Sequence, residues 1–478
     1  MSFQNQSGDL ASFVEVVPES AKMGQLSKSS LLTQRKRVRL TPQTGPTSGP
    51  SSQIQFLISD GSGMLDLRSV VINFTMFCTG SGSVAPDDCG AVFSTAQALL
   101  NGSLLENIQN AGKVSNVEMT MGGSKTYYET AGSFQGAELL APDLINDTTA
   151  GQYGVVSSNL ASIDARYKRL ANPMWNGIRG TQRSLPLGIL MGLGKCATLL
   201  PINILGELGL VFQTGSNSDV LFQTGTSGDA TYQLTNISLE ADIVVPDGRY
   251  MQLLQKVASE EGGMTIPYES VVVATGGQIN ASPSSLQESS IITSRATNHL
   301  TKSSIVFIPQ ALTSSFFYPS QSCFSHAGLF GFQTRIGSQV FPQIAAQGDA
   351  SIFSTSLCAY GSAMQENGTA TNRVLWANST NTSAGGTLSA SYEDAVSVPA
   401  AASRFAYGDR CVPSYGYRVV KGGAEPLDVD GVSLAGASGS QIIHTIVSAP
   451  QTNYTPYVLL TALRFIKASG GAVSVVGA

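Results

Sequence analysis

The segment from Tyr232 to Tyr268 constrains the fold more than any other part of the chain, and it lies near the middle of the 478 residues. β-branched and apolar residues in 232–245 predict a strand. In residues 248–261, GRYMQLLQKVASEE, apolar side chains recur at helical spacing on one face, and Gly262-Gly263 follows. A new strand is predicted from Met264. The sequence therefore predicts two β-rich units joined by one helix.

Both regions that flank this helix show the two-residue period of β-strands. Before the helix, the main predicted strands are 53–58, 64–77, 184–191, 196–204 and 206–213. After the helix, they are 264–274, 304–309, 329–335, 440–447 and 457–465. An Asn101-Gly102 pair between apolar runs predicts a hairpin. The pattern is therefore that of an all-β protein in which one kind of domain occurs twice.

Domain boundaries follow from the same pattern. Residues 122–180 and 361–403 are rich in loop-forming residues and are predicted to be long insertions, the first with room for one short helix. The predicted organisation is an N-terminal basic arm and linker (1–52), a first β-domain (53–247), a linking helix (248–262) and a second β-domain (263–478).

The arm is the one strongly basic part of the chain. Between Ala21 and Leu40 there are six basic residues and no acidic residue: Lys22, Lys28, Arg35, Lys36, Arg37 and Arg39. One interpretation is a solvated tail. The other is an arm that docks under neighbouring subunits or onto an acidic membrane or nucleic acid. An apolar cluster around Phe13 and Val14 favours docking, because a purely electrostatic tail needs no apolar patch.

Composition narrows the function classes. Charged residues make up 12% of the chain, about half of the usual share. Surfaces that stay monomeric usually carry more charge, so an obligate oligomer is expected. A net charge of −5 argues against nucleic-acid binding by the whole chain. The N-terminus has no secretory pattern, and no run of 18 apolar residues predicts a transmembrane span.

No catalytic, cofactor or metal site is predicted. The three histidines, His299, His326 and His444, are far apart and lack a second ligand at metal spacing. Cys323 and His326 are better explained by a histidine on a strand edge than by a reactive pair. Asp428 and Asp430 fit a solvated loop. Two further functions stay open: a two-domain β-sandwich lectin or adhesin that binds surface glycans, and an enzyme on a β-sandwich scaffold such as a glycosidase or cupin.

Four segments together carry a resemblance to a known family. They are LDLRSVVINFTMF (65–77), RSLPLGILMGLGKCATLLPINILGELGLVFQ (183–213), the strand–helix–strand segment 232–268 and FGFQTRIGSQVFPQ (330–343). In their order along the chain, they resemble the double jelly-roll major capsid proteins of eukaryotic DNA viruses, namely polinton-like viruses, adintoviruses and virophages. The resemblance covers residues 53–478.

This resemblance implies a fold and a function. It implies two consecutive eight-stranded jelly rolls, each with two four-stranded sheets, termed BIDG and CHEF. Three copies would form a pseudo-hexameric capsomer, and capsomers would self-assemble into an icosahedral virion shell. The implied partners are further copies of the chain, penton and minor capsid proteins, and an internal membrane or the genome through the arm. The role implied is structural, without enzymatic activity or cofactors, in a virion protein made in the host cytoplasm.

Overall fold

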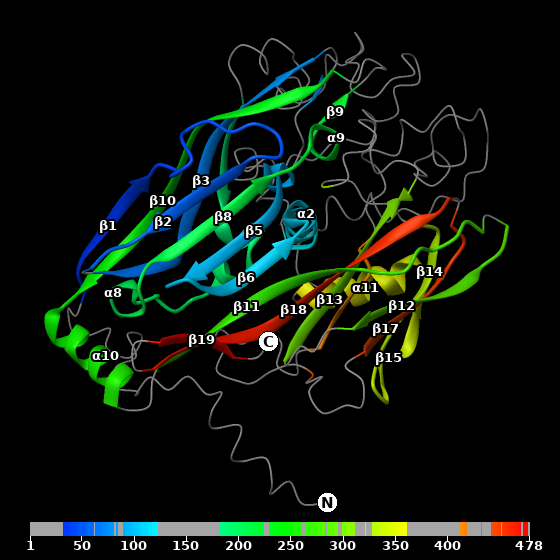
Figure 1. Cartoon of the computed structure of the whole chain (residues 1–478). Coiled ribbons are helices and arrows are strands. Elements are labelled where there is room, and N and C mark those ends of the chain that lie inside the picture. The colour runs from blue at the N-terminus through cyan, green and yellow to red at the C-terminus, as the bar shows by residue number, and fades with distance from the viewer. Residues whose placement is uncertain are drawn as a thin grey trace, which may run out of the picture.

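The described strands form four main antiparallel sheets in the computed structural model. Figure 1 shows the sheets in two groups side by side, one group from each half of the chain. The structure describes residues 32–61, 63–80, 83–84, 89–122, 181–223, 229–260, 264–282, 284–294, 299–310, 321, 327–360, 412–417, 432, 441–450, 452–469 and 472–476. The predicted insertions, apart from Gly122, lie outside these residues.

The first half contains two four-stranded sheets. One has the order β1 (Leu32–Leu40), β10 (Thr231–Pro246), β3 (Met64–Thr79) and β7 (Thr181–Pro186). The other has the order β2 (Gln53–Ile58), β8 (Leu208–Thr214), β5 (Phe93–Leu100) and β6 (Ser103–Gln109). A short pair, β4 (Ser83–Val84) and β9 (Phe222–Gln223), lies apart from them. Buried side chains alternate along the strands, and Phe93 contacts Phe74 of the facing sheet edge-on at 6.0 Å between ring centroids.

The second half repeats this construction. One sheet has the order β11 (Met264–Thr275), β18 (Tyr454–Ser469), β13 (Leu300–Pro309) and β16 (Ser414–Gly416), and β19 (Ala472–Val476) also pairs with β18. The other sheet has the order β12 (Gln287–Ser294), β17 (Gln441–Ser448), β14 (Leu329–Ile336) and β15 (Gln339–Gln347).

The two halves share one topology. When the eight main strands of each half are numbered in chain order, one sheet has the order first–eighth–third–sixth and the other second–seventh–fourth–fifth, in both halves. These are the BIDG and CHEF sheets of a jelly roll, which is a double Greek key. The prediction of an all-β double jelly roll is confirmed.

Local predictions from the sequence had mixed outcomes. The predicted helix is α10 (Gly248–Glu260), with Tyr250 and Leu254 buried, and the hairpin turns at Asn101-Gly102 between β5 and β6. The predicted strand at 196–204 is wrong, and the strand predicted at 184–191 ends at Pro186. Short helices begin directly after Pro186 and Pro201, which occupy the N-cap positions in non-helical conformations. They are α7 (Leu187–Leu190), η5 (Gly192–Lys195) and α8 (Ile202–Leu205).

Two twelve-residue helices, α2 (Ala111–Gly122) and α11 (Asp349–Tyr360), follow the strands β6 and β15. Shorter helices are η2 (Cys89–Val92) and α9 (Asn217–Val220). The larger hydrophobic cluster fills the first jelly roll and extends into the second half at Tyr268 and Ile466, whereas the other cluster lies within the second half around Phe307 and Ile442. The apolar core thus continues across the junction of the two jelly rolls.

Candidate functional site

Four of the six predicted arm residues lie in a strand of the first jelly roll. Residues Leu32–Leu40 form β1, which pairs antiparallel with β10 at the edge of its sheet. The predicted start of the first domain at residue 53 is corrected by this finding. Val38 and Leu40 pack against the core, while Arg35, Arg37 and Arg39 are exposed on the other side. The high density of basic residues concealed this two-residue alternation.

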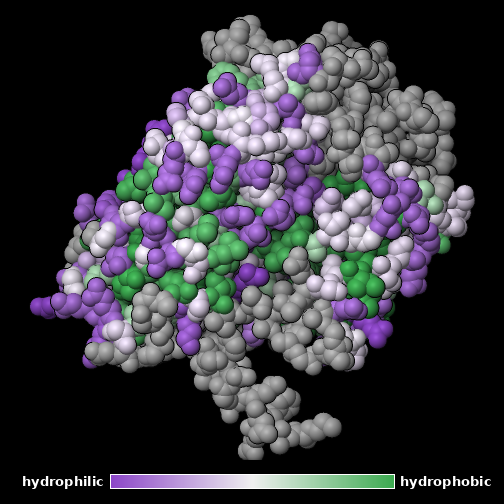
Figure 2. Space-filling model, viewed as in Figure 1, coloured by the Kyte–Doolittle hydropathy of each residue, from purple (hydrophilic) through white to green (hydrophobic). Residues whose placement is uncertain are grey.

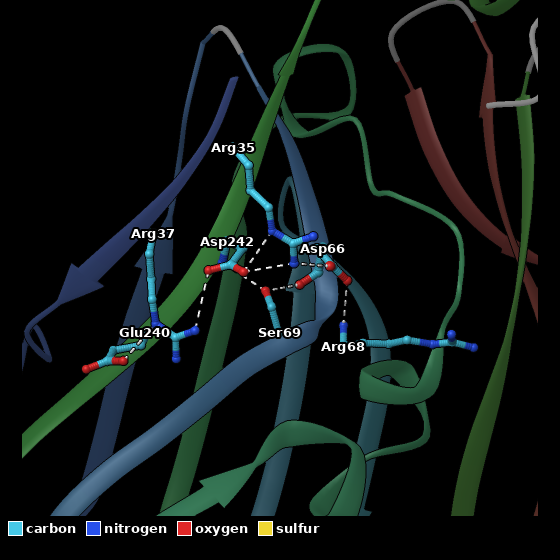
Figure 3. Close-up of polar contacts among 7 residues, drawn as sticks. All are labelled: Arg35, Arg37, Asp66, Arg68, Ser69, Glu240 and Asp242. Atoms are coloured by element: carbon cyan, nitrogen blue, oxygen red, sulfur yellow. Dashed lines mark hydrogen bonds and ion pairs between the residues drawn. The ribbon is translucent and has the colours of Figure 1, made fainter. Parts of the chain in front are cut away.

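The basic side chains of β1 meet carboxylates of the neighbouring strands (Figure 3). Arg35 donates from Nε to Asp242 Oδ2 at 2.9 Å and from Nη2 to Asp66 Oδ2 at 2.8 Å. Its pKa is raised above the ordinary value, chiefly by the hydrogen bond to Asp242. Arg37 donates from Nε to Glu240 at 2.9 Å, and Lys36 pairs with Asp60. The carboxylates therefore neutralise much of the charge on this edge strand.

The predicted site residues are consequently not equivalent. Arg35, Lys36 and Arg37 are engaged within the fold. Arg39 is exposed on β1. Lys22 and Lys28 lie outside the described residues.

A second charge cluster lies at the junction between the two jelly rolls. Glu118 of α2 accepts from Lys195 of η5 at 2.6 Å and from Lys302 of β13 at 3.0 Å. The Lys302 ammonium also lies 3.7 Å from the ring centroid of Tyr360, as in a cation–π contact. Burial disfavours the charged form of Glu118, but the two ammonium groups outweigh burial and lower its pKa to about 2. The cluster therefore ties the first jelly roll to the second.

Glu106 of β6 makes the second polar link at the junction. Its fully buried carboxylate accepts hydrogen bonds from the backbone N–H groups of Leu193 at 3.0 Å, Gly192 at 3.3 Å and, in the other jelly roll, Val271 at 2.7 Å. Burial raises the pKa of Glu106, and these three donors oppose that shift. A Cβ at Gly192 would lie 2.2 Å from the carbonyl oxygen of Glu269, so this close approach requires glycine.

The outward face of the β2–β8–β5–β6 sheet has a different character. None of its side chains is charged; they are Gln53, Gln55, Leu57, Gly209, Val211, Gln213, Thr95, Gln97, Leu99, Leu104, Asn107 and Gln109. Figure 2 shows this mixture of hydrophilic and hydrophobic side chains over these strands. Depletion of charge is typical of surfaces that become buried between protein chains.

Of the comparisons with known proteins, the one with solved structures found matches. No family model and no curated protein matches the chain. A Faustovirus major capsid protein superposes with a TM-score of 0.55 at 8% identity, covering 91% of this chain and 90% of that one. The Sputnik virophage structure matches with a TM-score of 0.54 at 12% identity (94% and 89% covered), and the PBCV-1 capsid with 0.52 at 10% (93% and 97% covered). This chain has the double jelly-roll fold of viral major capsid proteins. At these identities the likeness is one of fold.

His444, one of the residues considered for catalysis, has the surroundings of a structural residue in this double jelly roll. His444 is buried on β17, with Nδ1 2.9 Å from Thr334 Oγ1 and its ring stacked on Phe332. Burial lowers its pKa to about 3, so the ring is neutral. Within the ranges that the structure describes, no group of three or more His, Cys, Asp or Glu residues could hold a metal ion. Cys323, His326, Asp428 and Asp430 lie outside those ranges.

The junction residues were missed by sequence reasoning. Glu118 lies in a helix that was not predicted, and Lys195 and Lys302 are far from it in sequence. The sequence held one sign of the junction, because Glu106 is the single carboxylate in the apolar run Leu104–Ile108.

Among the described helices, none is long and apolar enough to cross a membrane.

Proposed function

We propose that this chain is the major capsid protein of a DNA virus, a structural subunit of the virion shell. Three copies would form a pseudo-hexameric capsomer, and capsomers would form an icosahedral lattice together with penton and minor capsid proteins. The observation that carries the proposal is the identical sheet order in the two halves, on a fold shared with capsid proteins over more than nine-tenths of the chain.

The junction contacts support this role. Glu118 and Glu106 join elements of both jelly rolls through charge-assisted hydrogen bonds, and the larger apolar cluster spans the junction. One chain therefore presents two jelly rolls as a unit, and three chains present six. The uncharged face of the β2–β8–β5–β6 sheet and the low overall charge of 12% suit a protein with large surfaces buried in assembly.

Solution mass tests the proposal directly. Light scattering of the purified full-length chain is expected to give about three times 49.9 kDa, and electron microscopy is expected to show pseudo-hexagonal particles or shells. A stable monomer at every concentration, with no particles, would refute the capsid role.

We propose contacts with other components for fewer residues of the arm than the six predicted basic ones. Because Arg35, Lys36 and Arg37 are paired with carboxylates, contacts to neighbouring capsomers, an internal membrane or the genome are assigned to residues 1–31, with Lys22 and Lys28, and to Arg39. Deleting residues 1–31 is expected to leave the capsomer mass unchanged and to impair shell formation. Capsomers that dissociate on this truncation would contradict the assignment. Deleting residues 1–40 would also remove β1. This longer truncation is therefore the control that is expected to destabilise the first jelly roll.

A further inference from the structure

The first strands of the two jelly rolls are held in place by different forces. β1 and β11 are counterparts, because each lies at the edge of its sheet and pairs antiparallel with the last main strand of its own half. In β11, eight of the twelve side chains are buried. Of the β1 side chains that the structure describes, Gln34 to Leu40, none is buried; Lys36, Val38 and Leu40 are half-buried and the others are exposed. β1 therefore contributes little to the apolar core.

Ion pairs take the place of this missing apolar contact. Three consecutive basic residues of β1, at positions 35–37, pair with four carboxylates on β3, on β10 and just after β2, namely Asp60, Asp66, Glu240 and Asp242. Figure 3 shows Arg35 and Arg37 reaching three of these carboxylates from the edge strand. Both arginine side chains are more than half exposed, so water and dissolved ions screen the pairs. Apart from its main-chain ladder with β10, β1 is thus held largely by contacts that weaken at high ionic strength.

The chain that follows β1 is anchored separately. Gln43 donates its N–H to the carbonyl oxygen of Gln55 at 2.8 Å, and Ser48 exchanges two backbone hydrogen bonds with Leu234, at 2.9 and 2.8 Å. These contacts do not involve β1, so they can hold the chain from Gln43 onward when β1 leaves. The boundary between the two parts falls at Thr41, which is exposed.

We propose that β1 is a releasable strand: residues 32–41 detach from β10 as a unit while the rest of the first jelly roll stays folded, and rising ionic strength favours the detached state. Segments with few buried apolar contacts open locally at a lower free energy than the whole fold. Release would free the basic side chains of β1 for other anionic partners. It would also give the preceding residues about 30 Å of additional reach, at the length of an extended chain.

This inference goes beyond the proposed function, because it concerns a single chain and holds whether or not that chain forms capsomers. Hydrogen exchange followed by mass spectrometry tests it on the full-length protein. Backbone amides of β1 are expected to exchange faster than those of β11. Raising sodium chloride from about 0.05 M to about 1 M should accelerate exchange in β1 about tenfold, because several weak ion pairs are screened together, and should leave β11 unchanged. Equal protection of the two strands at both salt concentrations would overturn the inference.

A second experiment removes the charges instead of screening them. The double variant Glu240→Gln with Asp242→Asn takes away partners of Arg35 and Arg37 and should raise β1 exchange several-fold at low salt, with a weaker response to added salt. The matched control is Glu288→Gln, which removes an exposed carboxylate from β12, the edge strand of another sheet, and should exchange like the wild type. Thermal unfolding confirms that both variants fold. A double variant that exchanges like the control would count against a strand held by charge.

Urea separates release of the strand from unfolding of the whole protein. Denaturant accelerates exchange in proportion to the surface that an opening exposes. Release of one edge strand exposes little surface, so urea below the unfolding midpoint should accelerate exchange in β11 far more than in β1. The same urea response in both strands would show that β1 opens only with the whole fold, and the inference would then be wrong while the proposed function stands.

Discussion

The charges at the junction and the charges on β1 are built from the same residue types in different surroundings. At the junction, the side chains of Glu118 and Lys302 are 14% and 12% exposed. On β1, the side chains of Arg35 and Arg37 are 56% and 53% exposed. The hydrogen-bond distances overlap, at 2.6 and 3.0 Å for Glu118 and 2.8–2.9 Å for Arg35 and Arg37, so geometry does not separate the two clusters.

Surroundings decide what each cluster contributes. Water and salt screen the ion pairs of β1, and exposed pairs of this kind contribute about 0–1 kcal/mol. A buried pair adds little over an apolar contact when intact, but removing one partner leaves a charge without compensation. The junction cluster should therefore be sensitive to single substitutions, whereas the β1 cluster should tolerate them.

The largest effect is expected for Glu118→Ala. This change leaves Lys195 and Lys302 facing each other at the junction without their shared carboxylate. The free energy of unfolding should fall by about 3 kcal/mol, the lower end for a broken buried pair, because Lys195 keeps about a third of its side chain in water. Urea denaturation measures the loss. Glu240→Ala on the surface is the control, and equal losses for both would contradict the comparison.

Glu106→Gln should have the next largest effect. The amide keeps the shape of the side chain but presents an NH₂ group to backbone donors that the carboxylate accepted, at Gly192, Leu193 and Val271. Leaving one or two of these buried N–H groups without an acceptor should lower the unfolding free energy by about 1–3 kcal/mol. Gln109→Glu on the exposed end of the same strand serves as the control in urea denaturation. An unchanged midpoint for Glu106→Gln would show that the carboxylate is dispensable.

His444 extends the comparison to a buried group that carries no charge. Its folded pKa of about 3 lies below the ordinary value of 6.5, so the unfolded chain binds the proton first as pH falls. The contribution is intact above pH 6.5 and is lost progressively towards pH 3. At pH 5 the loss should be about 2 kcal/mol relative to pH 7.5. Denaturation series at several pH values should show a shallower decline for His444→Gln; parallel curves would exclude this origin.

The smallest effect is expected for Arg35→Ala. Although Arg35 bridges Asp242 and Asp66, it is mostly in water, and its loss should cost less than about 1 kcal/mol. Raising the ionic strength to about 1 M should remove most of the difference from the wild type. Arg39→Ala should change stability even less. A loss of unfolding free energy for Arg35→Ala that does not depend on salt would show that the ion pairs of Arg35 behave like those at the junction.

Prediction from sequence was accurate where the signal is local. The period of two, the helix Gly248–Glu260 and the hairpin at Asn101-Gly102 are all encoded by neighbouring residues. It was inaccurate where a local signal was ambiguous. Apolar residues after Pro186 and Pro201 form short helices instead of a continued strand, and β1 was taken for an arm because its basic residues masked the alternation.

The amino-acid sequence by itself determined the secondary-structure periods, the duplication of a β-rich unit and the low overall charge, because each is a property of residue order and composition. Only the tertiary structure decided that β1 is an edge strand held by Asp242 and Asp66, that Glu106 is buried between the two jelly rolls, and that Glu118 lies there with 14% of its side chain exposed. Those outcomes depend on pairing and burial between residues far apart in the chain.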